Sequence, residues 1–591
     1  MLWPGPQSAS WQVGSSVGLR PFPLCMGTPE KATPAVTSSR RWVREVAVTT
    51  LLLGVGLLLF FYRLDSLYLF DADEPAYAEA AREMLISGDW ITPHFNFQPR
   101  FDKPILFYWL IALAYKSFGI GEYAARFWSA AFAAGLTASI YLFGRQLLGR
   151  RGACIAALAF ATNVGTIVLG RAAVTDMTLA FCMTWALFCF FDVYRATDKT
   201  HESLLFVGYL AVALAVLTKG PIGLLLPGLV IGLFLIIRRK VRATLSRLRL
   251  LSGLALFTVI ALPWYVLVLR ENGWTFVQGF FVQHHLNRYL GVVSSHVGGP
   301  LYFLPVVALG YFPWSGTLPN AFGHLWAIRS RLRDELTGRQ ELLLFLWVWC
   351  GVVVLFFSFS HTKLPSYIFP AVPALALLTG AAGEAAIDER QQGWRWERAC
   401  DWLVGGMACS LAVILLFLPS IADRIRLREA PDIPPFDFGL APYVLAVLLL
   451  VGLGLALVAR RRGQGDMAVA ATAVTMILSI VLAVHQVAPA IQESLQKSLH
   501  DFAIIARQEL RHGDILVAYD LNAPSLVFYS KRQVAIIKRG EEAGFHGLAV
   551  SYGRLFIVAK AAAETRLQQV PDIFPLDRRG GYVLYSNRYS P

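Results

Sequence analysis

The segment RRWVREVAVTTLLLGVGLLLFF, residues 40–61, decides the fold of this chain. Its second part, residues 46–61, follows Glu45 and contains only apolar and small side chains, as expected for a helix that enters a bilayer. Arg40, Arg41 and Arg44 precede this run, and positively charged residues tend to stay on the cytoplasmic side of a membrane. We therefore expect the N-terminus in the cytoplasm and the loop that follows the run outside.

The composition extends this expectation to the whole chain. Of its 591 residues, 56% are hydrophobic and only 16% are charged, against about 45–50% and about 25% in typical soluble proteins. The formal net charge is +14, but the basic residues form short clusters between apolar runs. This pattern is typical of membrane topology and not of nucleic-acid binding. The composition predicts an all-α polytopic membrane protein with no nucleic-acid partner.

Further apolar runs give the expected number of crossings. They lie at about 126–148, 153–170, 176–194, 204–218, 221–237, 250–269, 300–318, 342–359, 366–383, 402–420, 439–459 and 466–487. Together with the first run they predict thirteen transmembrane helices. The basic clusters at 145–151, 195–199, 238–249, 329–339, 390–398 and 460–462 then all fall on the cytoplasmic side.

The apolar stretch Ile105 to Tyr115 is interpreted differently. If it crossed the membrane, every later loop would change sides and the basic clusters would lie outside. Its aromatic residues suit the boundary between lipid and water, so we expect a helix that lies along the outer interface.

The chain divides into three expected regions. Residues 1–39 are predicted to be a disordered tail, and residues 40–487 a transmembrane domain with outer loops at 62–125, 270–300 and 360–366. Residues 488–591 are predicted to form a periplasmic α/β domain. In it we expect strands at 515–519, 525–529, 534–537, 555–558 and 582–585, with helices near 492–511 and 561–569. The chain has no phosphate-binding loop of the type G-x-x-x-x-G-K-[ST], which argues against an ATP-driven pump.

Most of the unusual polar residues fall on the outer side of this topology. They are Asp71, Asp73, Glu74, Asp102, Lys103, Asp176, Lys219, His284, His285, Arg288, His296, Lys363 and Tyr367. Structural roles are open for many of them: the first acids could begin a helix, Asp176 could cap one, and the lysines could extend along the lipid interface. The histidines suit a polar interface as well as a metal or substrate site.

Carboxylates beside cations at one membrane face suit the transfer of a sugar from a lipid phosphate. Cleavage of the glycosidic bond leaves a phosphate anion, which lysine or arginine can bind, while a carboxylate positions or deprotonates the incoming nucleophile. The apolar tail of such a donor needs a site that is open to lipid. An outward-facing cavity ringed by membrane helices would meet both needs.

At these residues the chain resembles the polytopic lipid-linked-sugar glycosyltransferases of the GT-C type. It is most similar to the bacterial aminoarabinose lipid A transferase group, which is related to protein O-mannosyltransferases. The resemblance rests on DEPAYAE at 73–79, AREML at 81–85, SGDW at 87–90, DKPI at 102–105, Asp176, TKGP at 218–221, HLNR at 285–288, YFPWS at 311–315 and KLPSYIFP at 363–370.

The resemblance implies roles for particular residues. Asp73 would lie nearest the reacting centre, Asp176 would be a second essential acid, and Lys103 and Tyr367 would contact the donor phosphate. We also expect Glu74 to be catalytic, and we expect further donor phosphate contacts from Lys219, His285, Arg288 and Lys363.

The chain departs from the family pattern at two positions. Ala76 stands where the lipid A enzymes usually have arginine, and Asp102 stands where they have glutamate before the lysine. The first departure leaves the sugar and the acceptor open, and the second bears on metal binding, because Asp102 is the candidate ligand for a possible zinc, manganese or magnesium ion.

The expected function is an inverting glycosyltransfer from a polyprenyl-phosphate donor of the undecaprenyl type. The acceptor would be a lipid similar to lipid A, a glycan or a protein at the periplasmic face of a bacterial inner membrane. We expect a monomer in contact with membrane lipids. The alternative is a transporter or flippase of lipid-linked sugars, but such proteins place polar sites near the membrane midplane, whereas the charges here gather at one face.

The topology can be tested by cysteine labelling. Single cysteines in a cysteine-free background should react with an impermeant maleimide added from outside at positions near 292 and 545, but not near 245, because that region carries the basic cluster expected in the cytoplasm. Equal labelling near 245 and 292, or no labelling near 545, would contradict the thirteen-helix topology.

Overall fold

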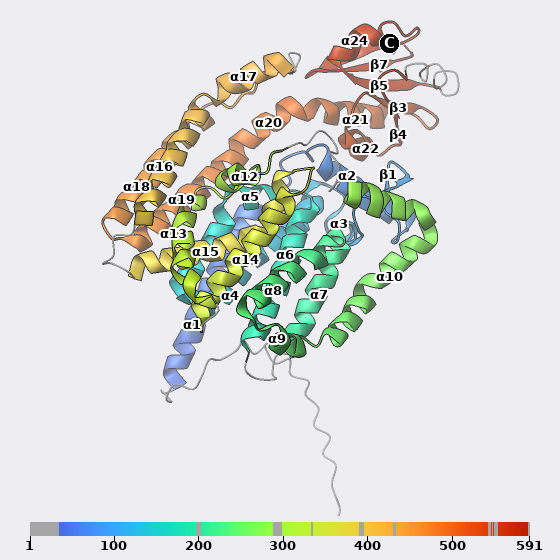
Figure 1. The fold of residues 1–591 in the computed structure, drawn as a ribbon. Helices are drawn as coiled ribbons and strands as arrows, with labels where there is room; N and C mark the ends of the chain where they lie inside the picture. The colour runs from blue at the N-terminus through green and yellow to red at the C-terminus, as the bar shows by residue number, and fades with distance from the viewer. Residues whose placement is uncertain are drawn as a thin grey trace, which may run out of the picture. The chain divides into compact units, whose positions relative to one another are not determined.

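The computed structural model describes residues 35–196, 202–287, 298–332, 335–388, 395–429, 433–541, 545, 548 and 553–588. From Thr49 onward the chain forms one compact unit of helices with a β-sheet near the C-terminus (Figure 1). The predicted tail lies outside the described residues, except that the first helix already begins at Ala35.

The helices before residue 300 are α1 (Ala35–Phe61), α2 (Asp73–Ser87), α3 (Leu106–Phe118), α4 (Glu122–Thr162), α5 (Val164–Gly170), α6 (Thr175–Arg195), α7 (Glu202–Lys219), α8 (Ile222–Arg238), α9 (Val241–Leu248), α10 (Leu250–Val277) and η1 (Gln278–Asn287). Those after it are α12 (Phe303–Gly310), η2 (Trp314–Thr317), α13 (Leu318–Ile328), η3 (Arg329–Arg331), α14 (Gly338–Ser358), η4 (Pro365–Ala371), α15 (Val372–Asp388), α16 (Arg395–Leu416), α17 (Leu418–Glu429), α18 (Ala441–Arg461), α19 (Gly465–Leu482), η5 (Ala483–Val487), α20 (Ala488–Leu495), α21 (Lys497–Glu509), α22 (Pro524–Ser530), η6 (Ala561–Ala563) and α24 (Glu564–Leu567).

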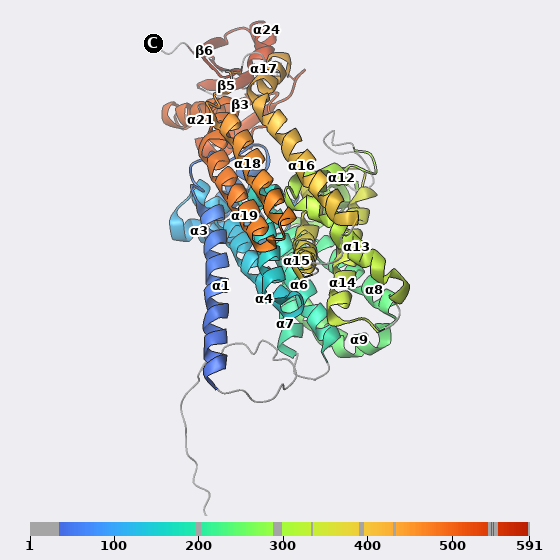
Figure 2. The ribbon, with the colours of Figure 1, turned by 90° about the vertical axis from the view of Figure 1, so that its left-hand side faces the viewer.

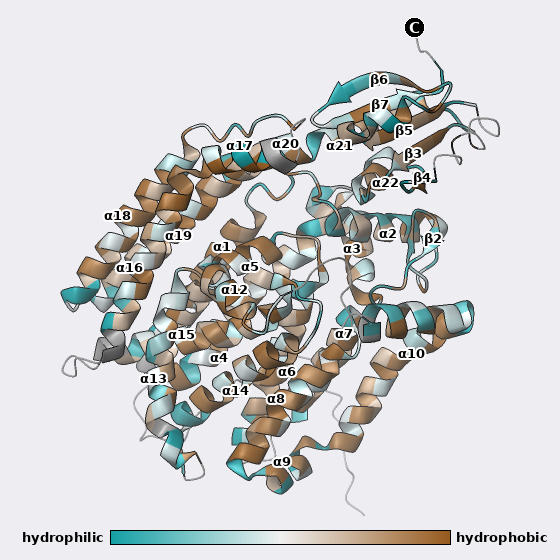
Figure 3. Cartoon of the chain, turned by 45° about the horizontal axis from the view of Figure 1, so that its top comes forward, coloured by the Kyte–Doolittle hydropathy of each residue, from teal (hydrophilic) through white to brown (hydrophobic). Residues whose placement is uncertain are grey.

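Among the described residues, ten helices are long and apolar enough to cross a membrane. One of them, α4, bends at Gly149, whose φ of 72° is left-handed, so it contains the predicted run 126–148 and the first part of the run 153–170, whose remainder forms α5. Helix α8 is apolar but has only 17 residues. Helices α16, α18 and α19 lie side by side (Figure 2), and apolar residues dominate them, whereas strand β6 (Phe574–Arg579) is hydrophilic (Figure 3). The exact count of thirteen crossings stays a prediction.

The predicted continuous helix at 300–318 is wrong. The chain there forms the short helix α12, a turn, the 3-10 helix η2 and the start of α13. Pro313 and Pro319 explain the breaks, because proline lacks the amide hydrogen that a helix needs and restricts the residue before it.

The segment between α1 and α4, which is the predicted first outer loop, carries α2, α3 and a two-stranded hairpin of β1 (His94–Phe95) and β2 (Gln98–Pro99). Helix α2 is capped by Gly88, which adopts a left-handed φ of 73° and donates its amide hydrogen to the carbonyl of Met84. Helix α3 corresponds to the helix predicted at 105–115. Its 13 residues span only about 20 Å. It is too short to cross a bilayer, and its position at the interface stays a prediction.

Near the C-terminus a five-stranded sheet has the strand order β4-β3-β5-β7-β6. Its strands are β3 (Ile515–Tyr519), β4 (Val534–Ile537), β5 (Leu555–Lys560), β6 and β7 (Tyr582–Ser586). Strands β4, β3 and β5 are parallel, whereas β7 and β6 are antiparallel to their neighbours. Alternate residues of β3 bury on opposite faces: Leu516 and Ala518 join one core cluster and Val517 and Tyr519 another.

One predicted strand of this region is wrong: residues 525–529 form helix α22. Pro524 occupies the first turn, where proline favours a helix, and all seven residues are buried. In a short run that is buried on every side, the sequence does not reveal a helical or strand periodicity, which explains the error. The predicted boundary at 488 falls within a continuous helical run, Gly465–Leu495, so the domain division stays a prediction.

The C-terminal region contacts the first outer loop directly. The Asn96 side chain donates to the carbonyl of Val534 at 2.8 Å and accepts from its amide at 2.8 Å, so it pairs with the edge strand β4. Ser525 donates its amide hydrogen to Asp71 at 2.8 Å, and its hydroxyl also donates to this carboxylate. Burial raises the pKa of Asp71 to about 6. Two residues beyond Asp71, helix α2 begins.

Candidate active site

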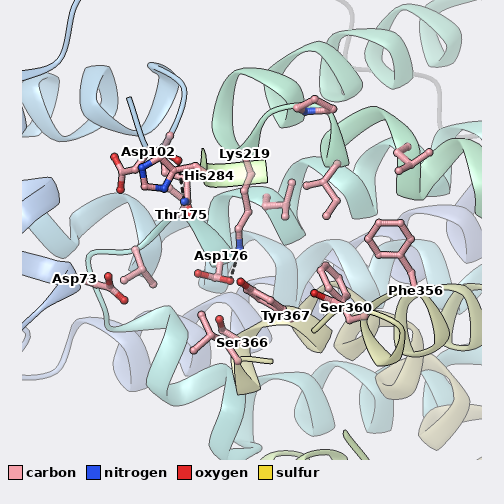
Figure 4. Close-up of a pocket in the computed structure, with 18 of the residues that line it drawn as sticks. Asp73, Asp102, Thr175, Asp176, Lys219, His284, Phe356, Ser360, Ser366 and Tyr367 are labelled. Atoms are coloured by element: carbon pink, nitrogen blue, oxygen red, sulfur yellow. Dashed lines mark hydrogen bonds and ion pairs between the residues drawn. The ribbon is translucent and has the colours of Figure 1, made fainter. Parts of the chain in front are cut away.

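A cavity of about 430 Å³ lies among α2, α6, α7, α8, η1, α14 and η4. Its wall contains most of the polar residues that the sequence placed outside (Figure 4). The lining residues are Asp73, Tyr77, Asp102, Lys103, Val174, Thr175, Asp176, Leu179, Lys219, Pro221, Ile222, Leu225, Phe281, His284, Phe356, Phe357, Ser360, Leu364, Ser366 and Tyr367.

Asp73 is the first residue of α2 and lines one end of the cavity (Figure 4). Its side chain is exposed, and within the described part of the chain it has no hydrogen-bond or ion-pair partner. The positive N-terminal end of a helix stabilises the charged carboxylate. Asp73 is therefore available to accept a proton or a hydrogen bond from a bound molecule.

Asp176 and Lys219 form an ion pair in the middle of the lining, with Nζ and Oδ1 2.8 Å apart. The pair joins the second residue of α6 to the last residue of α7. The side chains are only 11% and 16% exposed, so water screens the pair weakly. Lys219 also lies over the ring of Tyr367, with Nζ 5.7 Å from its centroid. Asp176 thus orients the lysine.

The turn after α7 explains how Lys219 reaches this position. Gly220 adopts a φ of 78°, a left-handed conformation that favours glycine, and its amide donates to the carbonyl of Val216 at 2.8 Å. At Gly223 an added Cβ would lie 2.4 Å from the backbone carbon of Ala215, so α7 and α8 pack closely. This tight turn presents the lysine at the end of α7.

Asp102 and Lys103 line the cavity from the loop before α3. Arg100 donates to both carboxylate oxygens of Asp102 at 2.7 Å, and the Tyr108 hydroxyl donates to Oδ1 at 3.1 Å. Burial alone would raise the pKa of Asp102, but Arg100 and Lys103 hold it well below its usual range. Lys103 donates to the backbone carbonyl of Asp102 at 2.9 Å.

The structure separates two residues that the sequence placed together. Tyr367 lines the cavity, whereas Lys363 is absent from its wall. The ammonium of Lys363 donates to the carbonyls of Ser358 at 2.7 Å and Ser360 at 2.6 Å, at the C-terminal end of α14. A lysine there satisfies terminal carbonyls and complements the negative end of the helix.

Glu74 also lies outside the cavity wall, contrary to the catalytic role expected for it. Arg126 donates to its two carboxylate oxygens at 2.8 and 2.7 Å, and the amides of Phe70 and Ala173 donate at 2.9 and 2.7 Å. Burial would raise the pKa of Glu74, but Arg126 lowers it below its usual range. Both oxygens of Glu74 are therefore engaged in holding α2 to its neighbours, and its expected catalytic role stays a prediction.

Helix η1 contributes His284 to the cavity wall, close to Asp102 in Figure 4. The side chain of His285 and the whole of Arg288 and His296 lie outside the described residues. Their expected roles in phosphate or metal binding stay predictions.

The described residues do not fit the divalent metal that the sequence left open. Both oxygens of Asp102, the candidate ligand, accept hydrogen bonds from Arg100. Within the described ranges, no three acidic, histidine or cysteine side chains gather as a metal site would require.

Known proteins are similar to this chain in sequence and in fold. Residues 102–266 match the family of dolichyl-phosphate-mannose-protein mannosyltransferases. The undecaprenyl phosphate-α-4-amino-4-deoxy-L-arabinose arabinosyl transferase 2 of Proteus mirabilis is 32% identical, over 66% of this chain and 67% of that protein. The corresponding transferase 1 of Sodalis glossinidius is 30% identical, over 73% of this chain and 75% of that protein. The chain belongs to this arabinosyl transferase family.

Solved structures agree with membership of the arabinosyl transferase family. The crystal structure of ArnT from Cupriavidus metallidurans bound to undecaprenyl phosphate has a TM-score of 0.76 and 28% identity, and covers 93% of this chain and 99% of that one. An oligosaccharyltransferase of Archaeoglobus fulgidus has a TM-score of 0.52 at 12% identity over 89% of this chain and 70% of that one, and shares the fold alone. The protein is a glycosyltransferase, as the sequence predicted, and the relatives favour this function over transport.

Sequence reasoning missed Arg100 and Arg126, which bind the two acids Asp102 and Glu74. Arg100 could have been noticed, because it lies two residues before Asp102. Nothing in the sequence connects Arg126 with Glu74, which is 52 positions away.

We expect Asp73→Asn to lower turnover by about a hundredfold or more while leaving the folded protein intact, because the change removes the charge and keeps the shape. Turnover of the purified protein with a polyprenyl-linked sugar donor measures this. Asp65→Asn, at an exposed position of the same loop, is the matched control. Equal turnover in Asp73→Asn and the wild type would remove Asp73 from the mechanism.

Glu74→Gln should show the opposite pattern, a loss of stability. Breaking a buried ion pair costs about 3–5 kcal/mol, so the thermal unfolding temperature in detergent should fall clearly. Glu493→Gln, which removes an exposed ion pair with Lys497, should leave it unchanged. A Glu74→Gln protein with wild-type thermal stability and no turnover would instead support the catalytic role expected from the sequence.

Proposed function

We propose that the cavity binds a sugar linked to undecaprenyl phosphate and that Asp73 activates the acceptor that attacks it. The observation that carries the proposal is the placement of an unpartnered carboxylate, Asp73, in the same cavity wall as two lysines, Lys103 and Lys219. A donor phosphate needs cations, and an acceptor hydroxyl needs a base. Both chemical requirements meet within one cavity.

The two ends of the cavity differ in polarity, which supports a lipid-linked donor. Figure 4 places Asp73 and Asp102 at one end and Phe356 at the other. Leu225, Phe281 and Phe357 add further apolar surface to the wall. A phosphate and its sugar would occupy the polar end, while the first isoprene units of the tail would lie against the apolar one.

In the proposed reaction, Asp73 accepts the proton of an acceptor hydroxyl as its oxygen attacks the anomeric carbon of the sugar. The bond from that carbon to the phosphate oxygen breaks, and its electron pair leaves with the polyprenyl phosphate. Lys103 and Lys219 stabilise the charge that develops on this leaving group. Asp176 holds Lys219 through their ion pair, and the ring of Tyr367 lies beside the ammonium of Lys219. A single displacement of this kind inverts the configuration at the anomeric carbon.

We further propose the setting of this reaction. The relatives named above act on an undecaprenyl phosphate-linked aminoarabinose, and a pentose of that class is the first donor to test. The acceptor would be a lipid, a glycan or a protein that reaches the outer face of a bacterial inner membrane. The N-terminus would lie in the cytoplasm, the C-terminal sheet would lie in the periplasm, and the protein would act as a monomer.

Donor binding tests the proposal. Lys103→Ala and Lys219→Ala should each weaken the binding of undecaprenyl phosphate by about 1.5–3 kcal/mol, the usual range for hydrogen bonds to charged groups. Equilibrium binding to the protein in lipid nanodiscs measures the loss.

Two other lysines serve as controls for this experiment. Lys116→Ala, at an exposed position of α3, should not affect binding. Lys363→Met should have little effect, because its nitrogen already binds the backbone carbonyls of Ser358 and Ser360 and Lys363 itself does not line the cavity. Unchanged binding in both Lys103→Ala and Lys219→Ala would show that the donor phosphate binds elsewhere.

A further inference from the structure

Arg100 lies behind the polar end of the cavity and does not belong to its wall. Its Nε donates to Oδ1 of Asp102 and its Nη2 donates to Oδ2, both at 2.7 Å. The two side chains are 18% and 17% exposed. This is a two-bond, parallel pairing of guanidinium and carboxylate, the geometry in which arginine binds an acid most strongly.

The guanidinium of Arg100 is held in place by its surroundings. Its central carbon lies 5.4 Å from the ring centroid of Tyr77 and 5.4 Å from that of Phe95. Contacts of this kind attract a cation to an aromatic face. Its backbone amide donates to the carbonyl of Pro93 at 2.8 Å. Arg100 therefore cannot easily move away from Asp102.

The charge of Asp102 would otherwise oppose the proposed donor site. Asp102 lines the cavity beside Lys103 and His284, where a donor phosphate would bind. An unpaired carboxylate there would repel the phosphate, and it would compete with the phosphate for the ammonium of Lys103. Lys103 contacts the backbone carbonyl of Asp102 in the structure, so its nitrogen already lies close to this residue.

We propose that Arg100 is a positioning residue that neutralises Asp102 and so keeps Lys103 directed at the donor phosphate. This inference rests on the proposed function, because it assumes that the phosphate binds beside Lys103. In this arrangement the cation that compensates Asp102 is a side chain of the chain itself, so the acid needs no metal ion to balance it. Arg100 acts through its neighbours and does not touch the substrate.

The proposal predicts a specific rescue. Arg100→Ala should weaken undecaprenyl phosphate binding by about tenfold, because the charge of Asp102 is exposed to the phosphate and to Lys103. In the double variant Arg100→Ala, Asp102→Asn the charge is gone, and binding should return to within about threefold of the wild type. Arg100→Lys, which keeps the charge but not the two-bond geometry, should fall between them. In steady state, the donor KM should rise in Arg100→Ala more than kcat falls.

The control is Arg579→Ala. Arg579 pairs with Asp577 at 2.7 Å, also two residues away, but in the C-terminal sheet, so donor binding should not change. If Arg100→Ala does not fold, donor binding is compared between the single variant Asp102→Asn and the double variant Arg100→Ala, Asp102→Asn. Equal binding by these two variants supports the proposal, and unequal binding contradicts it.

The results also separate this inference from the proposed function. If Lys103→Ala weakens donor binding but Arg100→Ala binds as the wild type does, the donor site stands and the role of Arg100 is wrong. A weakened Arg100→Ala that Asp102→Asn fails to rescue also overturns that role, since Arg100 would then support only the local fold. If neither Lys103→Ala nor Arg100→Ala changes binding, the donor site itself is wrong.

Discussion

The buried pair of Arg126 and Glu74 is the interaction on which the rest of the site depends. Arg126, on α4, binds Glu74 through two hydrogen bonds and also donates to the carbonyls of Leu64, Leu67 and Tyr68 in the first outer loop. Glu74 in turn accepts from the amide of Ala173, just before α6. One guanidinium and one carboxylate thereby join the first outer loop, α2, α4 and the start of α6. Asp73 and Asp176 project from the two elements that this pair holds together.

A second constraint is the cost of charge at the edge of a membrane. A lysine or carboxylate that loses water needs a partner, and the structure meets this need in different ways. Lys219 has Asp176, Asp102 has Arg100, and Lys363 has backbone carbonyls. Asp73 is the exception, since it stays exposed in the cavity without a partner among the described residues. This difference is the reason why we propose Asp73 as the reacting group and the other charged residues as groups that organise the site.

Sequence patterns predicted the elements best where a single regularity governs them. Strands β3 and β4 have the predicted bounds, because both are short runs rich in valine and isoleucine, which favour strands. The prediction failed at 525–529, where every residue is buried and the burial pattern shows no periodicity. It also failed at 300–318, because the high hydropathy of this run outweighed the helix-breaking prolines within it. For the site, charge and topology were enough to place Asp73, Asp102, Lys103, Asp176, Lys219 and Tyr367 on one side of the membrane, and all six line one cavity.

By itself, the sequence determined that this is a polytopic membrane glycosyltransferase, because hydropathy and motifs are local properties that can be read along the chain. Only the tertiary structure decided which charged groups face the cavity. Glu74 adjoins Asp73 in the sequence but points to Arg126, and Lys363 lies close to Tyr367 but binds the end of α14. The physical reason is that the role of a buried charge depends on its partner. That partner often comes from an element distant in the sequence, and only folding brings the two within hydrogen-bond distance.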